Sequence, residues 1–182
     1  MIIGHLPAGY ILSKLSASRF AHSISRYRTY MFWGMFGSIA PDLDMFYFHL
    51  IDHRQTHHHK YFSHYPIVWL GLVVIASILS MSKTAREKFG IYALVFSVTG
   101  FFHLTIDTIV GDIWWLAPFI NRSFSLATVP AVFHPWWLNF ILHWSFLLEL
   151  AVIVWAVWLW RRSPNPAVEV ALHDKAAQRH SL

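Results

Sequence analysis

The sequence contains no cysteine among its 182 residues, which excludes disulfides and thiolate metal ligands. Charge is also scarce, at 13% of the chain, whereas 56% of the residues are hydrophobic and 18% are aromatic. That balance is typical of a membrane protein and unlike a soluble domain. Neither a G-x-S-x-G nucleophile motif nor a phosphate-binding glycine loop occurs, so chemistry that depends on those motifs is excluded.

The charges that are present are mostly basic, with 14 Lys and Arg against 9 Asp and Glu. They form short clusters between apolar blocks, which fits a membrane surface better than a nucleic acid. We therefore expect the lipid bilayer as a partner and no nucleic acid. The N-terminal segment lacks a basic n-region and a small-residue cleavage site, so we expect it to remain in the mature protein.

Four long apolar runs predict an all-α polytopic membrane protein with about four transmembrane helices, at residues 30–50, 66–81, 89–110 and 136–160. Residues 1–15 are apolar but too short to span, and predict an interfacial or re-entrant helix. Residues 1–162 thus form one membrane-embedded domain, followed by a polar tail, residues 163–182, that we expect to be disordered. Trp114, Trp115, Trp136 and Trp137 are interpreted as an aromatic belt.

The positive-inside rule places the basic residues of 14–28 and 83–88, together with Arg161 and Arg162, on the cytoplasmic side of a bacterial inner membrane. Both termini are then cytoplasmic. The opposite face collects most of the residues that can bind a metal: Asp42, Asp44, His59, His64, His103, Asp107, His134 and His143.

His103 and Asp107 lie one helical turn apart, so both side chains can reach a common ion. An isolated pair of this kind is more often a helix-capping aspartate beside an interfacial histidine. Within an apolar segment, a carboxylate costs about 2.5–3.5 kcal/mol and persists mainly when it is paired or functional. The apolar context therefore favours a functional pair.

Asp42 and Asp44 follow Pro41 and are separated by one residue. Two carboxylates this close repel each other unless one is protonated or a cation lies between them. A helix-capping role for Asp42 is an equal alternative on this motif alone. The 13 histidines favour a metal, since mixed His and Asp donors suit zinc, manganese or iron.

The loop between the first two apolar runs carries five histidines. His59 and His64 are the predicted ligands, while His53, His57 and His58 are interpreted as bystanders. His5 and His143 are secondary candidates for the metal site. Lys60 and Arg54 are loop cations that could steer an anionic substrate such as a phosphate ester.

These motifs, taken in order, resemble a known family. Gly37 with Pro41, Asp42 and Asp44, then His59, Lys60, Ser63 and His64, then His103 and Asp107, then Trp115, Leu116 and Pro118 are similar to successive motifs of the YdjM-like membrane-bound proteins, described as metal-dependent hydrolases. His5 matches an N-terminal histidine of that family. The resemblance runs from His5 to about Phe119.

The sequence departs mildly from the family's pattern, because Lys60 and Ser63 replace the usual Arg and Thr. More distantly, the family resembles the zinc-dependent phospholipase C and nuclease superfamily, which implies phosphoester hydrolysis. The His-x-x-x-Glu pair of that superfamily is missing, since Leu147 follows His143 by four residues.

The sequence thus predicts a membrane-embedded hydrolase that uses a divalent metal, zinc foremost with manganese or iron as alternatives, to activate water towards a phosphoester or lipid phosphate. Asp42, Asp44 and Asp107 are its candidate catalytic carboxylates, and Lys60 its candidate cation. The predicted metal ligands are Asp42, Asp44, His59, His64, His103 and Asp107. His5 and His143 are secondary candidates. The alternative is a non-enzymatic protein that binds or transports divalent metals; a purely structural role for the polar residues ranks third.

Overall fold

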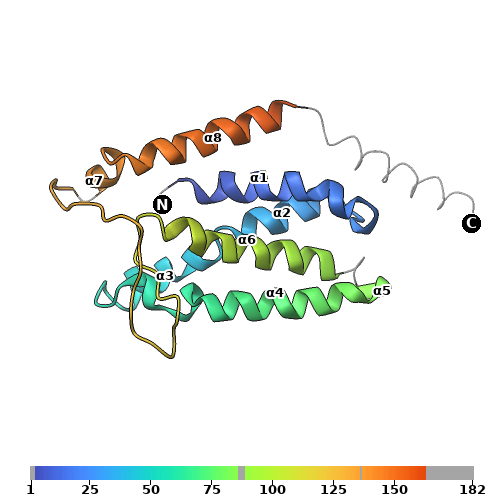
Figure 1. The fold of residues 1–182 in the computed structure, drawn as a ribbon, viewed down its shortest axis with the longest axis horizontal. Coiled ribbons are helices and arrows are strands. Elements are labelled where there is room, and N and C mark those ends of the chain that lie inside the picture. Colours follow the sequence, from blue (N-terminus) through green and yellow to red (C-terminus); the bar gives the residue numbers. More distant parts are fainter. Residues whose placement is uncertain (1–2, 86–88, 136, 163–182) are drawn as a thin grey trace, which may run out of the picture.

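The structure, a computed structural model, describes residues 3–85, 89–135 and 137–162 (Figure 1). Over these residues it is helical, as expected for an all-α chain. The helices are α1 (His5–Ala17), α2 (Tyr27–Gly37), α3 (Asp44–Leu50), α4 (Pro66–Met81), α5 (Lys83–Ala85), α6 (Ile91–Asp107), α7 (Trp137–Ile141) and α8 (Ser145–Arg161). Short 3₁₀ turns connect them: η1 (Ser18–Ser23), η2 (Pro41–Leu43), η3 (His58–Lys60) and η4 (Phe62–His64).

The prediction of a polytopic membrane protein is wrong for this structure. None of the helices in the described ranges is both long enough and apolar enough to cross a bilayer. Crossing needs about 20 helical residues, whereas α4 has 16 and α6 and α8 have 17 each. The expected tail, residues 163–182, lies outside the described residues.

The first apolar run shows why the expected spans fail. The chain leaves α2 after Gly37, makes the turn η2 at Pro41 and starts the seven-residue helix α3 at Asp44. Proline suits the first position of a helical turn but lacks the N–H that would continue the preceding helix. The run is therefore divided into short helices. The last run is divided likewise into α7 and α8.

The long helices pack side by side in one elongated bundle (Figure 1). Helix α8 packs on α1, α1 packs on α2, and both α2 and α4 pack on α6. Helices α2 and α6 end at the same end of the bundle at which α1, α4 and α8 begin. That end also carries α3 and the connection before α7, so it gathers the loops that bear the polar residues.

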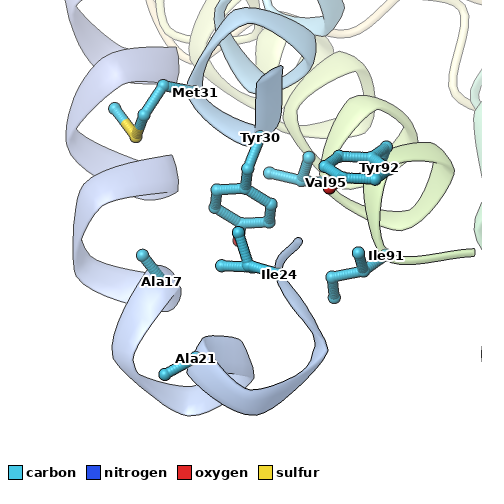
Figure 2. Packing of buried hydrophobic residues seen from close by; sticks show 8 residues of the cluster. All are labelled: Ala17, Ala21, Ile24, Tyr30, Met31, Ile91, Tyr92 and Val95. Atoms are coloured by element: carbon cyan, nitrogen blue, oxygen red, sulfur yellow. The ribbon is translucent and has the colours of Figure 1, made fainter. Parts of the chain in front are cut away.

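A hydrophobic core fixes the opposite end of the bundle, where η1 turns the chain from α1 into α2 (Figure 2). Its members come from α1, η1, the link after η1, α2 and α6, and Ile24, Tyr30 and Ile91 are almost fully buried. The hydroxyl of Tyr92 meets the backbone N–H groups of Ser25 and Arg26 at 3.2 Å each. The core therefore ties the start of α6 to the start of α2.

Closer to the polar end, glycine allows α2 to approach α6. A β-carbon on Gly37 would lie 2.2 Å from the backbone oxygen of Phe96, so no side chain fits there without moving a helix. Gly100 similarly faces the indole of Trp69 on α4. These close contacts set the position of α6, whose last turn carries His103 and Asp107.

Candidate metal centre

Six of the predicted ligand residues meet at the loop-bearing end of the bundle. His5 begins α1, Asp42 lies in η2, His59 in η3 and His64 in η4, and His103 and Asp107 occupy the last turns of α6. The side chains of His5, His59, His64, His103 and Asp107 are buried. Five separate elements thus bring their polar residues to one place.

Four of these residues form a compact group. One ligand atom from each of Asp42, His64, His103 and Asp107 lies within 4.8 Å of the others. His103 Nε2 is 2.9 Å from Asp107 Oδ2 and 3.5 Å from Asp42 Oδ1, and His64 Nε2 is 3.6 Å from Asp42 Oδ1. Two imidazoles and two carboxylates at these separations match the donor set of a zinc or manganese site.

Three histidines direct the same nitrogen away from the group. The Nδ1 atom lies 2.8 Å from Ser38 O in His103, 2.9 Å from Asp112 O in His59 and 2.7 Å from Asp44 Oδ2 in His64. A carbonyl or carboxylate oxygen can only accept, so each Nδ1 donates. In the neutral ring, Nε2 then has the free lone pair, which is the arrangement that outer partners impose on metal-binding histidines.

The inward nitrogens face carboxylate oxygens. His64 Nε2 and His103 Nε2 are buried, and in the neutral rings, whose proton is on Nδ1, neither makes a hydrogen bond to the described residues; they pair with Asp42 and Asp107 only when the rings are protonated. Leaving a buried polar atom without a hydrogen bond costs about 1–3 kcal/mol. A cation among these nitrogens and the adjacent carboxylates would satisfy them, so the residues present fit a metal ion.

The pKa values of the clustered histidines and carboxylates also fit a cation site. Burial alone would lower the pKa of His103, but the carboxylates of Asp107 and Asp42 outweigh it and raise the pKa to about 10. The pKa of His64 is also raised, because Asp42 and Asp44 overcome its burial. Conversely, these histidines hold the pKa of Asp42 and of Asp107 well below the usual range, against the effect of burial. The centre therefore keeps ionised carboxylates that protons balance when no metal is bound.

His5 and His59 complete the wall of the centre around Asp107. His5 stacks on His103 with ring centroids 3.8 Å apart, and its Nε2 lies 3.1 Å from Asp107 Oδ1. His59 Nε2 lies 3.7 Å from the other oxygen, Asp107 Oδ2. Burial lowers the pKa of both rings, that of His59 to about 2, so both are neutral at pH 7 and able to ligate.

Asp44 is not one of the four clustered residues and instead contacts the outward nitrogen of His64. Its Oδ2 accepts hydrogen bonds from His64 Nδ1 and, at 2.6 Å, from the hydroxyl of Ser63. The side chain is only 7% exposed. Asp44 thus fixes the ring orientation of His64.

A cavity of about 440 Å³ adjoins the centre. Its lining combines polar side chains, among them Asp42, Asp107, His58 and His59, with the apolar side chains of Met45, Val110, Val129 and Phe140. Asp42 is the most accessible carboxylate of the group, with 35% of its side chain exposed. A molecule in this cavity would therefore touch the metal-binding residues directly.

Other predicted residues lie apart from the centre. His143 contacts the hydroxyl of Ser145, and exposed Lys60 lies over the ring of Trp114 with its Nζ 5.0 Å from the centroid. Exposed Arg54 has a left-handed backbone, with φ at 64°. None of the three lines the cavity.

Sequence reasoning missed three contributors to the centre. The backbone oxygens of Ser38 and Asp112 orient His103 and His59, and a carbonyl oxygen leaves no signal in residue type. His58, interpreted as a bystander, lies on the cavity wall with its ring centroid 4.0 Å from that of His59. Its position beside His59 in a histidine run was the only available signal.

Comparison with known proteins places the chain in a family. The search of curated proteins and the search of solved structures both return no match. A family model described as "YdjM inner membrane protein" matches residues 1–171, which is nearly the whole chain and includes every residue of the centre. That description indicates an inner-membrane location, and it names no activity. The chain belongs to the YdjM inner membrane protein family.

Proposed function

We propose that this protein is a metal-dependent hydrolase that acts on phosphoesters. One observation carries the proposal: histidines anchored through Nδ1 direct Nε2 towards two ionised carboxylates, beside a cavity large enough for a substrate. A structural cluster would need neither the oriented nitrogens nor the adjoining cavity. An enzyme that activates water with a metal needs both.

The donor set defines the class of metal. It offers imidazole nitrogen and carboxylate oxygen, and the sequence has no cysteine to supply sulfur. Such donors suit zinc, manganese or iron, with zinc as the leading candidate. Asp42, His64, His103 and Asp107 would hold the ion. When bound, the ion would supply Lewis acidity and an activated water nucleophile.

Neighbouring residues position this group, and one of its own carboxylates would assist the reaction. Asp44 holds the ring of His64, and the backbone oxygen of Ser38 holds that of His103. Asp42 reaches the cavity and is the best-placed carboxylate to accept a proton from an attacking water. His5 packs flat on His103 and limits the movement of that ring.

The cavity supports the substrate class. An anionic phosphate group would lie against the metal-binding residues, where the bound cation would attract it. The apolar lining residues, including Val129 and Phe140, would accommodate a hydrocarbon portion of the same molecule. A lipid phosphate combines the two and is consistent with the family's inner-membrane description. A lipid phosphate is therefore the proposed physiological class.

Turnover tests the proposal. Purified protein would be stripped with a chelator, reloaded with zinc or manganese, and assayed with p-nitrophenyl phosphate and with phosphatidic acid. We expect no phosphate release from stripped protein, recovery on reloading, and a loss of at least about a hundredfold in Asp107→Asn because a ligand is removed.

Exposed His49 on α3 provides the control, since His49→Ala changes a histidine outside the centre and should keep full turnover. Metal binding without release of phosphate from any phosphoester would refute the hydrolase proposal and favour a metal-binding or transport role.

A further inference from the structure

We infer that a second cavity, lined by Asp44, Asp52 and several aromatic side chains, binds an amphiphilic organic ammonium, which is a molecule with a protonated amine and a hydrocarbon chain. The cavity has a volume of about 770 Å³ and is bounded by residues of η2, α3, η4, α4 and α6. None of the described residues lines both this cavity and the one beside the metal centre. The two sites are therefore separate.

Asp44 provides the polar anchor of the second cavity. Its Oδ2 accepts hydrogen bonds from His64 Nδ1 and from the hydroxyl of Ser63, whereas its Oδ1 is buried and makes no hydrogen bond to the described part of the chain. Only 7% of the side chain is exposed. A buried carboxylate oxygen without a donor is unfavourable. An N–H group of a ligand in the cavity would supply that donor.

The charge of the lining favours a cationic ligand. Asp44 and Asp52 both line the cavity, and no Lys, Arg or His of the described ranges does so. The oxygens of Asp52 accept from the N–H and the hydroxyl of Thr56, at 2.7 and 3.4 Å. Asp52 thus adds negative charge while Asp44 keeps the spare acceptor. A cleft lined by charge of one sign concentrates ions of the other sign.

The rest of the lining suits a hydrocarbon chain attached to the ammonium. The rings of Tyr47 and Tyr61 meet edge to face with centroids 5.3 Å apart, and the indole of Trp69 lines the same cavity. Aromatic rings attract organic cations as well as apolar groups. Leu43 and Phe62 also line the cavity and are 45% and 74% exposed, so a chain that covered them would remove apolar surface from water.

Binding of octylammonium to wild-type protein tests the site. Purified protein in a nonionic detergent would be titrated in a calorimeter, with the heat of titration into protein-free detergent subtracted. We expect saturable binding of octylammonium. Octanoate should bind at least about tenfold more weakly, because its carboxylate would face Asp44 and Asp52. Ethanolammonium should also bind at least about tenfold more weakly, because it lacks the chain.

The same titrations can overturn the inference without any variant. Equal affinities for octylammonium and octanoate would show an apolar cavity with no preference for a cation. Equal affinities for octylammonium and ethanolammonium would show that the hydrocarbon chain is not recognised. Absence of octylammonium binding would exclude the site outright.

A substitution locates the binding site. Asp44→Asn should weaken octylammonium binding at least about tenfold, because it removes the charged acceptor. Asp112→Asn is the matched control: it makes the same change at a residue that lines the other cavity, and it should keep the wild-type affinity. Folded Asp44→Asn protein that binds octylammonium as tightly as wild type would contradict the inference.

Discussion

At the scale of single residues, His64 shows how the centre is prepared for a cation. One ring nitrogen donates to Asp44, and the other is buried beside Asp42 without a hydrogen bond to the described part of the chain. The ring is thus held in one orientation by a contact outside the ligand group. His103 repeats the arrangement with a backbone oxygen, Ser38 O, as its anchor.

Proton release should accompany metal binding. The carboxylates of Asp42 and Asp107 raise the pKa of His103 to about 10, so this ring is protonated at pH 7 when no metal is bound. The pKa of His64 is also raised, by Asp42 and Asp44. A metal requires unprotonated Nε2 atoms, so zinc binding should release protons, and affinity should fall as the pH is lowered.

Isothermal titration calorimetry in buffers of different ionisation enthalpy measures this release. The binding enthalpy should change with the buffer in wild type and equally in His49→Ala, whose histidine is exposed and outside the centre. A binding enthalpy that is the same in every buffer would show that no proton leaves these rings when the ion binds, and would contradict this prediction.

Residue types and spacing predicted much of this centre, though not the positions of its outer contacts. The i, i+4 spacing of His103 and Asp107 predicted their proximity, and the two side chains lie 2.9 Å apart. Asp44 was predicted to bind the metal and His58 to be a bystander. Spacing alone could not show which of the two side chains faces the centre. The structure places Asp44 behind His64 and His58 on the cavity wall, because the turns η2 to η4 decide which side chains face inward.

At the scale of elements, the contact between α2 and α6 positions the centre. A β-carbon at Gly37 would meet the backbone oxygen of Phe96, which cannot rotate away as a side chain would. Gly37→Ala should therefore lower the free energy of unfolding by about 1–3 kcal/mol, measured by chemical denaturation.

Gly71 is the matched control, because it lies inside α4 and a β-carbon there would meet no atom within 4 Å. Gly71→Ala should raise the free energy of unfolding by up to about 1 kcal/mol, since alanine favours a helix interior. Equal effects of the two substitutions would argue against close packing of α2 on α6.

Helices α1 and α8 each supply a charged side chain that hydrogen-bonds backbone groups at an end of the other helix. Glu149 on α8 accepts from the N–H groups of Ile3 and Gly4, at 2.6 and 2.9 Å, just before His5. Lys14 on α1 donates to the backbone oxygen of Leu159 near the end of α8. Both charged side chains are buried. Lys14, expected as part of a basic cytoplasmic flank, instead binds the end of a neighbouring helix.

Removing the first of these contacts should disturb both the fold and the centre. Glu149→Ala should lower the free energy of unfolding by about 1–3 kcal/mol, because buried N–H groups lose their acceptor. Zinc affinity should also fall, since His5 follows the released segment. Glu149→Gln keeps an acceptor oxygen and should recover most of both losses; equal losses in the two variants would show that charge, and not the hydrogen bonds, is required.

The helices themselves were predicted with mixed success, for a physical reason. The apolar run at residues 66–81 coincides with α4. Hydropathy predicts one span over residues 30–50, although Pro41 begins the turn η2 and Asp44 begins the helix α3 within it. Length of an apolar run is therefore a poor measure of helix length where proline interrupts it. Spacing along the chain carries no signal for the contacts of Glu149, because its partners Ile3 and Gly4 lie 146 and 145 positions away.

At the scale of the whole molecule, the two ends of the bundle differ in the residues that they bury. A hydrophobic core of α1, η1, α2 and α6 fixes one end, and the polar centre occupies the other (Figures 1 and 2). The start of α1 and the end of α6 meet there because the helices run in opposite directions. Residues as distant as His5 and Asp107 thereby become neighbours.

Zinc binding by the intact chain tests the central claim most directly. Equilibrium dialysis against buffered zinc would compare wild-type protein with His103→Ala, which removes one ligand from the middle of the group, and with His49→Ala. We predict stoichiometric zinc in wild type and His49→Ala, and an affinity at least about tenfold weaker in His103→Ala. Wild-type protein that binds no zinc, manganese or iron, or that binds zinc as tightly after His103→Ala, would contradict the account.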